Sequence, residues 1–306
     1  MDAQIQALPF DPRSLAGLSE RLIVSHHANN YSGAVKRLNA IRRQLGTLDW
    51  SSAPGFVING LKREELIAAN SMFLHELYFA TLGGDGQLAP GGVWVALERD
   101  FGSVERWQAE FTALAKAMGG GSGWAVLAWS PREARLVNQW ASDHTQLLAG
   151  ATPLLALDMY EHAYHLDYGA NAGAYVDAFM RNIRWQVVSE LHAAAVEAAS
   201  PAFGMPAQHG LGAAAQIVDV RRAGVFAGAS ELIDGAVWRD PAAVATWADA
   251  IDRSRPVLVY CVFGHEVGRS TALALRARGI DARYLVGGIE AWKANGLPTQ
   301  AKGESS

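Results

Sequence analysis

One stretch of the chain decides how the rest is interpreted: Thr152-Pro-Leu-Leu-Ala-Leu-Asp158-Met-Tyr-Glu161-His162-Ala-Tyr164. An apolar run, typical of a buried strand, leads directly into an Asp-x-x-x-His pair. A buried carboxylate beside an imidazole is costly unless a cation or a hydrogen-bond partner receives both groups. Aspartate oxygen and neutral histidine nitrogen are ordinary ligands of transition metals. The stretch therefore predicts a metal site at the end of a buried strand.

Two histidines upstream, His26 and His75, lie on helical patterns and complete a four-ligand set. His27 is an alternative to His26, but consecutive helical residues point about 100° apart, so only one of them can face the site. His26 shares a stripe with Leu22 and Asn30 and is preferred. The predicted metal ligands are His26, His75, Asp158 and His162.

A second arrangement of histidines stays open on spacing alone. His162 and His165 lie about one helical turn apart and could form a separate surface metal site. That alternative leaves Asp158 without a role.

The composition limits the classes of protein. Of the 306 residues, 50% are hydrophobic and 18% are charged, and the net charge is −4. These values favour a globular chain of about two domains and argue against a nucleic-acid partner. No leader pattern or long apolar run is present, so we expect a cytoplasmic protein without a membrane partner. Cys261 is the single cysteine, which excludes an intrachain disulfide.

The hydrophobic patterns predict a helical half followed by an α/β half. Helices are expected over residues 18–45, 62–80, 103–117 and 172–198, and a β-hairpin over 124–140. Residues 199–212 have the composition of a linker. Beyond it, short β-branched runs at 216–220, 257–261 and 282–286 alternate with helical segments, which is typical of a small domain with a parallel sheet.

Residues 7–198 resemble an iron/manganese superoxide dismutase. The resembling motifs are Ala7-Leu-Pro-Phe10, Leu18-Ser-Glu followed by His26, Leu38-Asn39, His75-Glu-Leu-Tyr78-Phe79, Gly121-Ser-Gly-Trp124, Asp158-Met-Tyr-Glu-His162-Ala-Tyr164 and Trp185. The resemblance implies an α-helical hairpin domain (1–90) and an α/β domain with a three-stranded antiparallel sheet (91–198). It also implies that the four predicted ligands hold one iron or manganese ion per chain and that superoxide is the substrate.

The same resemblance implies an outer shell and an assembly. The outer-shell positions are His144, Asn30, Tyr160, Trp124 and His165. The implied assembly is a homodimer, or a tetramer built from dimers, with Glu161 reaching the partner's His162 and Tyr164 at the interface.

The chain departs from the family at several positions. Ala34 stands where the family usually has a gateway tyrosine, Asn30 and His165 replace a paired His and Tyr, and Tyr160 replaces a tryptophan. Loss of the gateway phenol should widen access to the metal and change product inhibition. The ligand set does not distinguish iron from manganese, because the outer shell tunes that choice; we favour iron.

Cys261 ends a strand and precedes a loop and a helix. A lone buried cysteine is commonly a small hydrophobe, but one that opens onto a helix N-terminus has its pKa lowered by backbone N–H groups and the helix dipole. Residues 213–300 resemble a single rhodanese domain, through Val218-Asp-Val-Arg221, Asp234-Gly-Ala236, Val257-Leu-Val-Tyr-Cys261, Leu285-Val-Gly-Gly288, Glu290-Ala-Trp292 and Gly296-Leu-Pro298. The resemblance implies that Cys261 carries a persulfide sulfur cradled by the N–H groups of Val262, Phe263, Gly264, His265, Glu266 and Val267.

This loop is unusual for the fold. Glu266 stands where many sulfurtransferases have a basic or hydroxyl residue, which disfavours anionic donors. Phosphatase relatives need an arginine six positions after the cysteine, and that position here is Val267. The loop is similar to that of rhodanese-like proteins of chromate-resistance clusters, which suggests a role in oxidative or chromate stress.

Three functions follow as hypotheses. The leading one is a metal-dependent superoxide dismutase fused to a rhodanese-like domain (213–306). The second is a sulfur-handling protein, with a sulfur donor, acceptor or oxyanion at Cys261, for which the first part is a dimerising, metal-bound scaffold. The third is an inert recognition module at Cys261 and Glu266.

Overall fold

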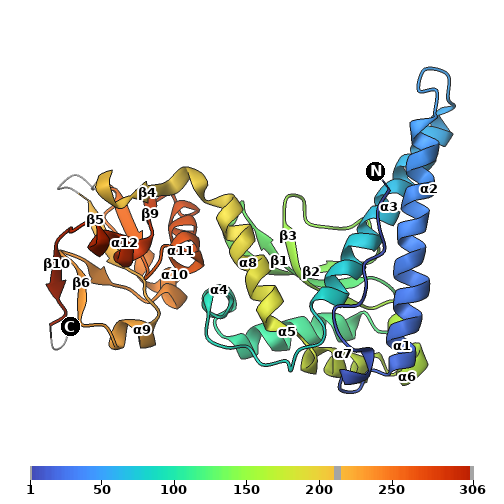
Figure 1. Ribbon diagram of the computed structural model, residues 1–306, viewed down its shortest axis with the longest axis horizontal. Helices are drawn as coiled ribbons and strands as arrows, with labels where there is room; N and C mark the ends of the chain where they lie inside the picture. The colour runs from blue at the N-terminus through green and yellow to red at the C-terminus, as the bar shows by residue number, and fades with distance from the viewer. Residues whose placement is uncertain (1, 210–214, 304–306) are drawn as a thin grey trace. The chain divides into compact units, whose positions relative to one another are not determined.

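The computed structural model describes residues 2–209 and 215–303, and the chain groups into two compact units (Figure 1). The first unit comprises the chain up to Leu88, Gln108–Ala128 and Asn138–Val188; the second comprises Ala89–Trp107, Trp129–Val137 and the chain from Ser189 onward. Among the described residues, no helix is both long enough and apolar enough to cross a membrane.

A helical hairpin opens the first unit. The helix predicted over 18–45 forms as three consecutive segments, α1 (Glu20–Ser25), η2 (His26–Tyr31) and α2 (Ser32–Gly46). Ser19 is its N-cap and accepts a hydrogen bond from the Leu22 N–H at 3.1 Å. The η2 segment is a π-helix, a widened turn that occurs often at functional sites. The uniform helical pattern did not predict this widening.

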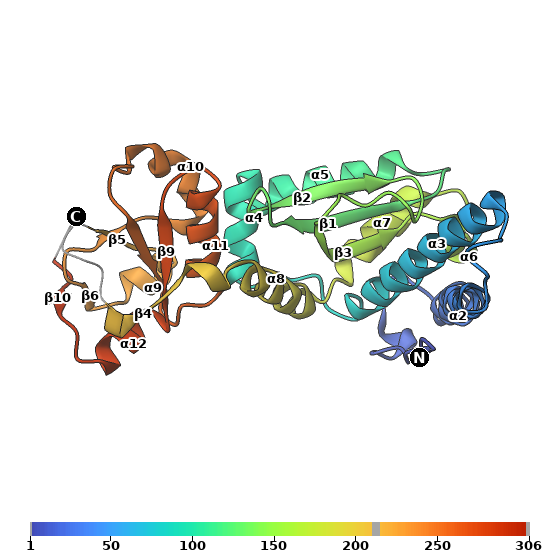
Figure 2. The ribbon, with the colours of Figure 1, turned by 90° about the horizontal axis from the view of Figure 1, so that it is seen from above.

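The second helix of the hairpin, α3 (Gly55–Ala80), starts seven residues before the predicted position. It lies beside α2 (Figures 1 and 2), and the facing side chains are apolar. Val35 and Leu38 of α2 and Ala68 and Met72 of α3 are buried, at the three- and four-residue spacings of a helix stripe.

A three-stranded antiparallel sheet follows, as predicted. Its order is β2-β1-β3, with β1 (Trp124–Ser130) in the centre, β2 (Arg135–Ala141) and β3 (Thr152–Asp158). Every residue of β1 is buried, as expected for a central strand covered on both faces. The α5 helix (Val104–Ala117) agrees with the pattern over 103–117. Because β3 packs against α3, the end of the strand meets the helical hairpin.

The remaining helices of this part differ from the sequence pattern. The helix predicted over 172–198 is broken into α7 (Ala172–Arg181) and α8 (Trp185–Ala199). Asn182 causes the break, because its side-chain amide donates to Ala16 O and Ala178 O and its Oδ1 accepts from Ala16 N. The helix α4 (Gly92–Phe101) was not predicted. The short elements are η1 (Pro12–Ser14), η3 (Glu161–Ala163) and α6 (His165–Tyr168).

The second unit contains a five-stranded parallel sheet of order β4-β9-β8-β5-β7. Its strands are β4 (Gly204–Pro206), β5 (Gln216–Asp219), β7 (Val237–Trp238), β8 (Val257–Tyr260) and β9 (Ala282–Val286). The β4 strand lies within the segment predicted as a linker and pairs with β9 at the sheet edge. A separate antiparallel pair joins β6 (Glu231–Ile233) to β10 (Thr299–Ala301).

Both faces of the parallel sheet are covered. Val257 and Val259 of β8 belong to one apolar cluster, and the alternate residues Leu258 and Tyr260 belong to another. This alternation explains why the strand sequence is apolar throughout. The covering helices and turns are η4 (Pro201–Phe203), η5 (Ala207–His209), α9 (Ala223–Ala227), η6 (Pro241–Ala243), α10 (Val244–Trp247), η7 (Ala248–Ala250), α11 (Glu266–Arg276) and α12 (Gly288–Ala294).

Candidate metal centre

The four predicted ligands converge in the first unit. One ligand atom from each of His26, His75, Asp158 and His162 lies within 4.8 Å of the others. His26 comes from the π-turn, His75 from α3, Asp158 from the end of β3 and His162 from η3. Three segments far apart in the sequence therefore supply one cluster.

One carboxylate oxygen lies at the centre of the cluster. The Nε2 atoms of His26, His162 and His75 lie 3.0, 3.1 and 3.4 Å from Asp158 Oδ2. Burial by itself raises the pKa of Asp158, but hydrogen bonds and charge from His162 and His26 outweigh it and hold the pKa well below its usual range. The carboxylate is therefore ionised.

The tautomer of His75 leaves an unprotonated nitrogen facing the Asp158 carboxylate. His75 Nδ1 lies 2.6 Å from the backbone oxygen of Ser71, which can only accept a hydrogen bond, so the proton is on Nδ1. Burial, reinforced by His26, lowers the pKa of His75 to about 3, so the ring is neutral. Its Nε2 is then a bare lone pair, buried without a hydrogen-bond partner, and it faces the Asp158 oxygen.

A metal ion fits between these groups. Two lone pairs 3.4 Å apart in a buried site repel unless a cation lies between them. Donor atoms about 2.1 Å from a shared ion, at angles of roughly 90–120°, would lie about 3.0–3.6 Å apart, which matches the spacing around Asp158 Oδ2. The donor set of three neutral imidazoles and one carboxylate is that of a first-row transition metal. The cluster can thus hold one metal ion.

The backbone around Asp158 fixes the orientation of its carboxylate. The Tyr160 N–H donates to Oδ1 at 2.9 Å, which leaves Oδ2 for the cluster. The hydroxyl of Tyr175 donates to the Asp158 carbonyl at 2.8 Å and lies 3.3 Å from the hydroxyl of Tyr78. Such outer contacts orient metal ligands and adjust their basicity.

Three of the predicted outer-shell residues lie together beside the cluster. The indole N–H of Trp124 donates to His144 Nδ1 at 2.9 Å. Because an indole can only donate, the proton of neutral His144 is on Nε2, and burial keeps the ring neutral by lowering its pKa. Tyr160 stacks on His144 and on His162, with ring centroids 5.0 and 5.5 Å apart. Burial, with the charge of Asp158, raises the pKa of Tyr160 to about 12.

The remaining predicted residues are Asn30, His165, Glu161 and Tyr164. Asn30 lines a pocket next to His144, and His165 is exposed at the start of α6. Glu161 is exposed, whereas Tyr164 is buried and contacts Tyr175 with ring centroids 5.4 Å apart.

Some functional residues were missed at the sequence level. Ser71 contributes a backbone carbonyl, which no side-chain motif reveals, although its spacing of four residues from His75 on a helix is suggestive. Tyr175 meets Asp158 only through tertiary packing. The π-turn that places His26 also has no signal in the apolar pattern.

The second predicted site is the loop at Cys261. The sulfur is buried and accepts hydrogen bonds from the backbone N–H groups of Phe263, Gly264, His265 and Gly268. The predicted cradle of residues 262–267 therefore extends to Gly268, whose own Cβ, if it had one, would lie 3.2 Å from Sγ. Gly264 adopts φ +69°, where a Cβ would meet the Leu285 oxygen at 2.4 Å.

The expected lowering of the Cys261 pKa is wrong. Burial raises the pKa of the thiol, and the four N–H donors only partly offset this effect. Within the second unit, Arg269 pairs with Glu197 at 3.0 Å, and Arg221 pairs with Asp219. Glu266 begins α11.

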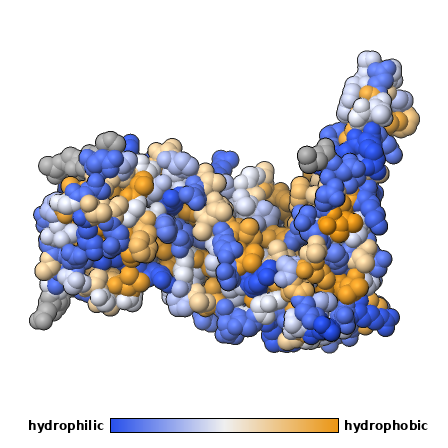
Figure 3. Space-filling view, in the orientation of Figure 1, coloured by the Kyte–Doolittle hydropathy of each residue, from blue (hydrophilic) through white to orange (hydrophobic). Residues whose placement is uncertain are grey.

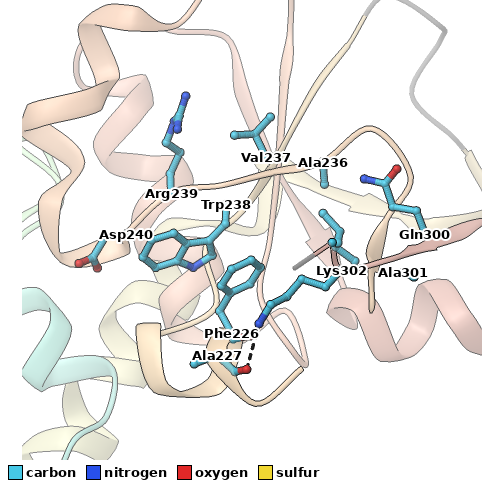
Figure 4. A pocket seen from close by; sticks show the side chains of 12 residues that line it. Phe226, Ala227, Ala236, Val237, Trp238, Arg239, Asp240, Gln300, Ala301 and Lys302 are labelled. Atoms are coloured by element: carbon cyan, nitrogen blue, oxygen red, sulfur yellow. Dashed lines mark hydrogen bonds between the residues drawn. The ribbon is translucent and has the colours of Figure 1, made fainter. Parts of the chain in front are cut away.

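A larger pocket in the second unit, of about 740 Å³, lies between β7 and β10 (Figure 4). Phe226 stacks on Trp238 with ring centroids 5.1 Å apart. The Lys302 ammonium donates to the carbonyls of Phe226 and Ala227 and lies over the Phe226 ring. The Lys302 ammonium is thus bound to the last carbonyl groups of α9. Cys261 does not line this pocket.

The fold and the cluster define a transition-metal protein with an appended α/β domain. Residues 90–191 match the family described as iron/manganese superoxide dismutases, C-terminal domain, and residues 207–295 match the rhodanese-like domain. The iron superoxide dismutase of Cupriavidus metallidurans is 65% identical over 193 residues, covering 63% of this chain and 98% of that protein. An iron superoxide dismutase of Aquifex aeolicus is 34% identical, covering 61% and 90%. A manganese superoxide dismutase of Halobacterium salinarum is 32% identical, covering 61% and 92%.

The chain belongs to the iron/manganese superoxide dismutase family and carries a rhodanese-like domain at its C-terminal side. Both resemblances drawn from the sequence are confirmed.

Proposed function

We propose that the chain dismutates superoxide at one iron or manganese ion held by His26, His75, Asp158 and His162. The observation that carries the proposal is the bare Nε2 of His75 facing Asp158 Oδ2 at 3.4 Å, an arrangement that needs a cation. The 65% identity to an iron superoxide dismutase favours iron. The overall reaction converts two superoxide anions and two protons into dioxygen and hydrogen peroxide.

The ion, when bound, supplies one-electron redox chemistry that oxidises one superoxide and reduces the next. The protein residues supply geometry and protons. Asp158 and three neutral imidazoles give the site a net charge of −1, which leaves a trivalent ion with residual positive charge that attracts an anion. His144 holds its proton on Nε2 because Trp124 occupies Nδ1, so it can donate a hydrogen bond beside the site. Stacking on Tyr160 fixes this ring.

Paired variants of adjacent histidines test the proposal. His26→Gln should lose the metal and dismutation, whereas His27→Gln should keep both, because His27 Nε2 contacts the Gln6 carbonyl and not the cluster. Metal content by elemental analysis and superoxide decay by pulse radiolysis give the two measurements. A fully metal-loaded wild-type protein that is no faster than the uncatalysed reaction would overturn the proposal.

A second activity, sulfur transfer at Cys261, is favoured by the four N–H groups on its sulfur. In this reaction the thiolate attacks the outer sulfur of a donor, the donor's S–S bond breaks and the donor leaves as sulfite or a thiolate. The backbone donors would stabilise the resulting persulfide anion. Incubation with thiosulfate or a polysulfide should add one sulfur to the mass of the wild-type chain and none to Cys261→Ser. Absence of the adduct with every donor would contradict this activity.

We also propose that two copies associate through the surface around Glu161. Glu161 is exposed next to His162, where it can reach a partner chain. Hydrophobic side chains are exposed on the helical hairpin as well (Figure 3), and one of them, Phe56 of α3 at 78% exposure, serves as the control for the surface around Glu161. Analytical ultracentrifugation should show a dimer that Glu161→Arg weakens and Phe56→Ser leaves intact. A monomeric wild type would contradict the proposal.

A further inference from the structure

A pocket of about 340 Å³ lies beside the metal cluster in the first unit. One wall comes from η2 and α2, with Asn30, Ala34 and Arg37. The opposite wall comes from α3, with Ile67 and Ala68, and from the turn that carries His144.

The pocket lies close to the cluster but apart from its ligands. Ser71 also lines it, and the carbonyl of this residue holds His75 Nδ1 at 2.6 Å. The ring centroid of His144 is 6.4 Å from that of His75. A molecule in this pocket would therefore sit next to the metal without replacing any of the four ligands.

The charge of the lining favours an anion. None of the lining residues is acidic. Arg37 supplies a guanidinium, and its contact with Glu64 uses Nη2, leaving other N–H groups free to bind. His144 offers the Nε2 proton fixed by Trp124. Two carboxylates lie beside the lining: Glu64 pairs with Arg37, and Asp143 accepts hydrogen bonds from the N–H and hydroxyl of Thr145 at 2.7 and 2.6 Å.

The volume of the pocket and its apolar wall indicate a ligand larger than superoxide. A two-atom anion needs about the volume of a water molecule, roughly 30 Å³, whereas pockets for small organic molecules start at roughly 300 Å³. Ala34 offers only a methyl group to the pocket and so leaves space there. Ile67 and Ala68 add an apolar surface that superoxide cannot use.

We propose that this pocket binds a small organic carboxylate next to the metal. Its carboxylate group lies against Arg37, Asn30 and His144, and its short apolar body lies against Ile67 and Ala68. Binding itself does not depend on dismutation, although the test below uses the proposed iron site as a distance probe. An occupant of this pocket also narrows the approach of other anions to the metal.

The probe is 4-fluorobenzoate, followed by ¹⁹F NMR with the iron-loaded full chain. Paramagnetic iron should broaden the signal of bound probe, and unlabelled benzoate should reverse the broadening. The neutral analogue 4-fluorobenzamide should show no saturable broadening, because the charged contact supplies most of the affinity. The metal-free chain should bind the probe without the paramagnetic contribution.

Three variants locate the site. Arg37→Gln should weaken binding about tenfold, the loss expected for a charge-assisted contact. Arg42→Gln is the matched control, because Arg42 lies on the same helix beside Glu65 but does not line the pocket. Ala34→Tyr should abolish binding by filling the space. Circular dichroism shows whether each variant folds.

Several results would overturn the inference: no saturable binding, equal affinity for the benzamide, or equal affinity in Arg37→Gln and wild type. A probe that changes the ferric absorption band as a metal ligand does would also overturn it, because the probe would then be on the iron. If the protein fails to take up iron, the proposed function fails. In that case, binding of 4-fluorobenzoate to the metal-free chain, and the loss of this binding in Arg37→Gln, would still test the pocket proposal on its own.

Discussion

His75 and Ser71 share one turn of α3, in which the imidazole Nδ1–H donates to the Ser71 carbonyl at 2.6 Å. This bond decides the chemistry of the other ring nitrogen, since it leaves Nε2 unprotonated. The same turn aims Nε2 at Asp158 Oδ2, 3.4 Å away. The helix therefore places an unprotonated nitrogen against a carboxylate oxygen. A metal ion bound between the two atoms would remove their repulsion.

The first prediction concerns the Asp158 carboxylate. Asp158→Asn should abolish metal binding and lower the free energy of unfolding of the metal-free chain by about 1–3 kcal/mol relative to the metal-free wild type. In the metal-free chain His26 and His162 hydrogen-bond to the carboxylate, and its depressed pKa means that the charge stabilises the folded state. Urea unfolding of both metal-free proteins, with metal content measured in parallel, checks the prediction.

The control for this variant is Asp167→Asn, a carboxylate that is exposed and bonded to Ser19. Asp167→Asn should keep the metal, and it should change the free energy of unfolding of the metal-free and the metal-loaded protein by the same amount. A metal-free Asp158→Asn protein that unfolds at the same urea as the metal-free wild type would show that these hydrogen bonds do not stabilise the ionised carboxylate.

Much of this site could be predicted from the sequence, and the reasons are local. Asp158 follows an apolar strand and His162 comes one turn later, so both residues could be placed before any fold was known. His75 interrupts an apolar helical face, which marks it as a functional residue. His26 could be chosen over His27 because helical geometry allows only one of them to face the cluster.

The missed features depend on tertiary structure. Asn182 ends α7 by bonding to Ala16, far away in the sequence, so the pattern over 172–198 could not reveal the break. The sign of the Cys261 pKa shift was wrong because the sequence shows a helix start after the cysteine but not how deeply the sulfur is buried. Burial outweighs the backbone donors.

A second prediction concerns the support of Asp158. Tyr175→Phe removes the hydroxyl that donates to the Asp158 carbonyl at 2.8 Å in a fully buried position. We expect a loss of about 1–3 kcal/mol in the free energy of unfolding. Metal affinity should fall by about tenfold or more, since outer contacts of ligands have effects of that size. Chelator competition measures the affinity.

The matched control for this tyrosine is Tyr168→Phe. Its hydroxyl donates to the Gly17 carbonyl at the surface, away from the cluster. This variant should leave metal affinity unchanged. Equal effects of the two substitutions on the metal would contradict a specific role of Tyr175.

A third prediction concerns the reactivity of Cys261. Because it is the single cysteine of the chain, alkylation of the protein measures the reactivity of this residue alone. Because burial raises its pKa, less than about 3% of the thiol is thiolate at pH 7. Iodoacetamide should alkylate the native chain far more slowly than the urea-unfolded chain, and the native rate should rise about tenfold per pH unit up to pH 8. Native alkylation at pH 7 that matches the unfolded rate would show an activated thiolate instead.

The last prediction is a pH dependence of stability caused by His192. Its ring is fully buried against Trp129, and neither nitrogen has a hydrogen-bond partner among the described residues. Burial, reinforced by the charge of Arg99, lowers its pKa to about 3. The unfolded chain, with a pKa of about 6.5, therefore takes up the proton first as the pH falls. The stabilising contribution is complete above about pH 6.5 and decreases as the pH falls toward 3.

Between pH 7 and pH 5 this linkage should remove about 2 kcal/mol from the free energy of unfolding of the metal-loaded chain. His192→Leu replaces an unpartnered imidazole by an apolar side chain of similar volume, so it should unfold at similar urea to wild type at pH 7 and at higher urea at pH 5. His165→Leu, at an exposed position, should keep the wild-type dependence. Identical pH profiles for His192→Leu and wild type would mean that His192 takes up its proton in the folded chain as readily as in the unfolded chain. The prediction of a buried, neutral His192 would then be contradicted.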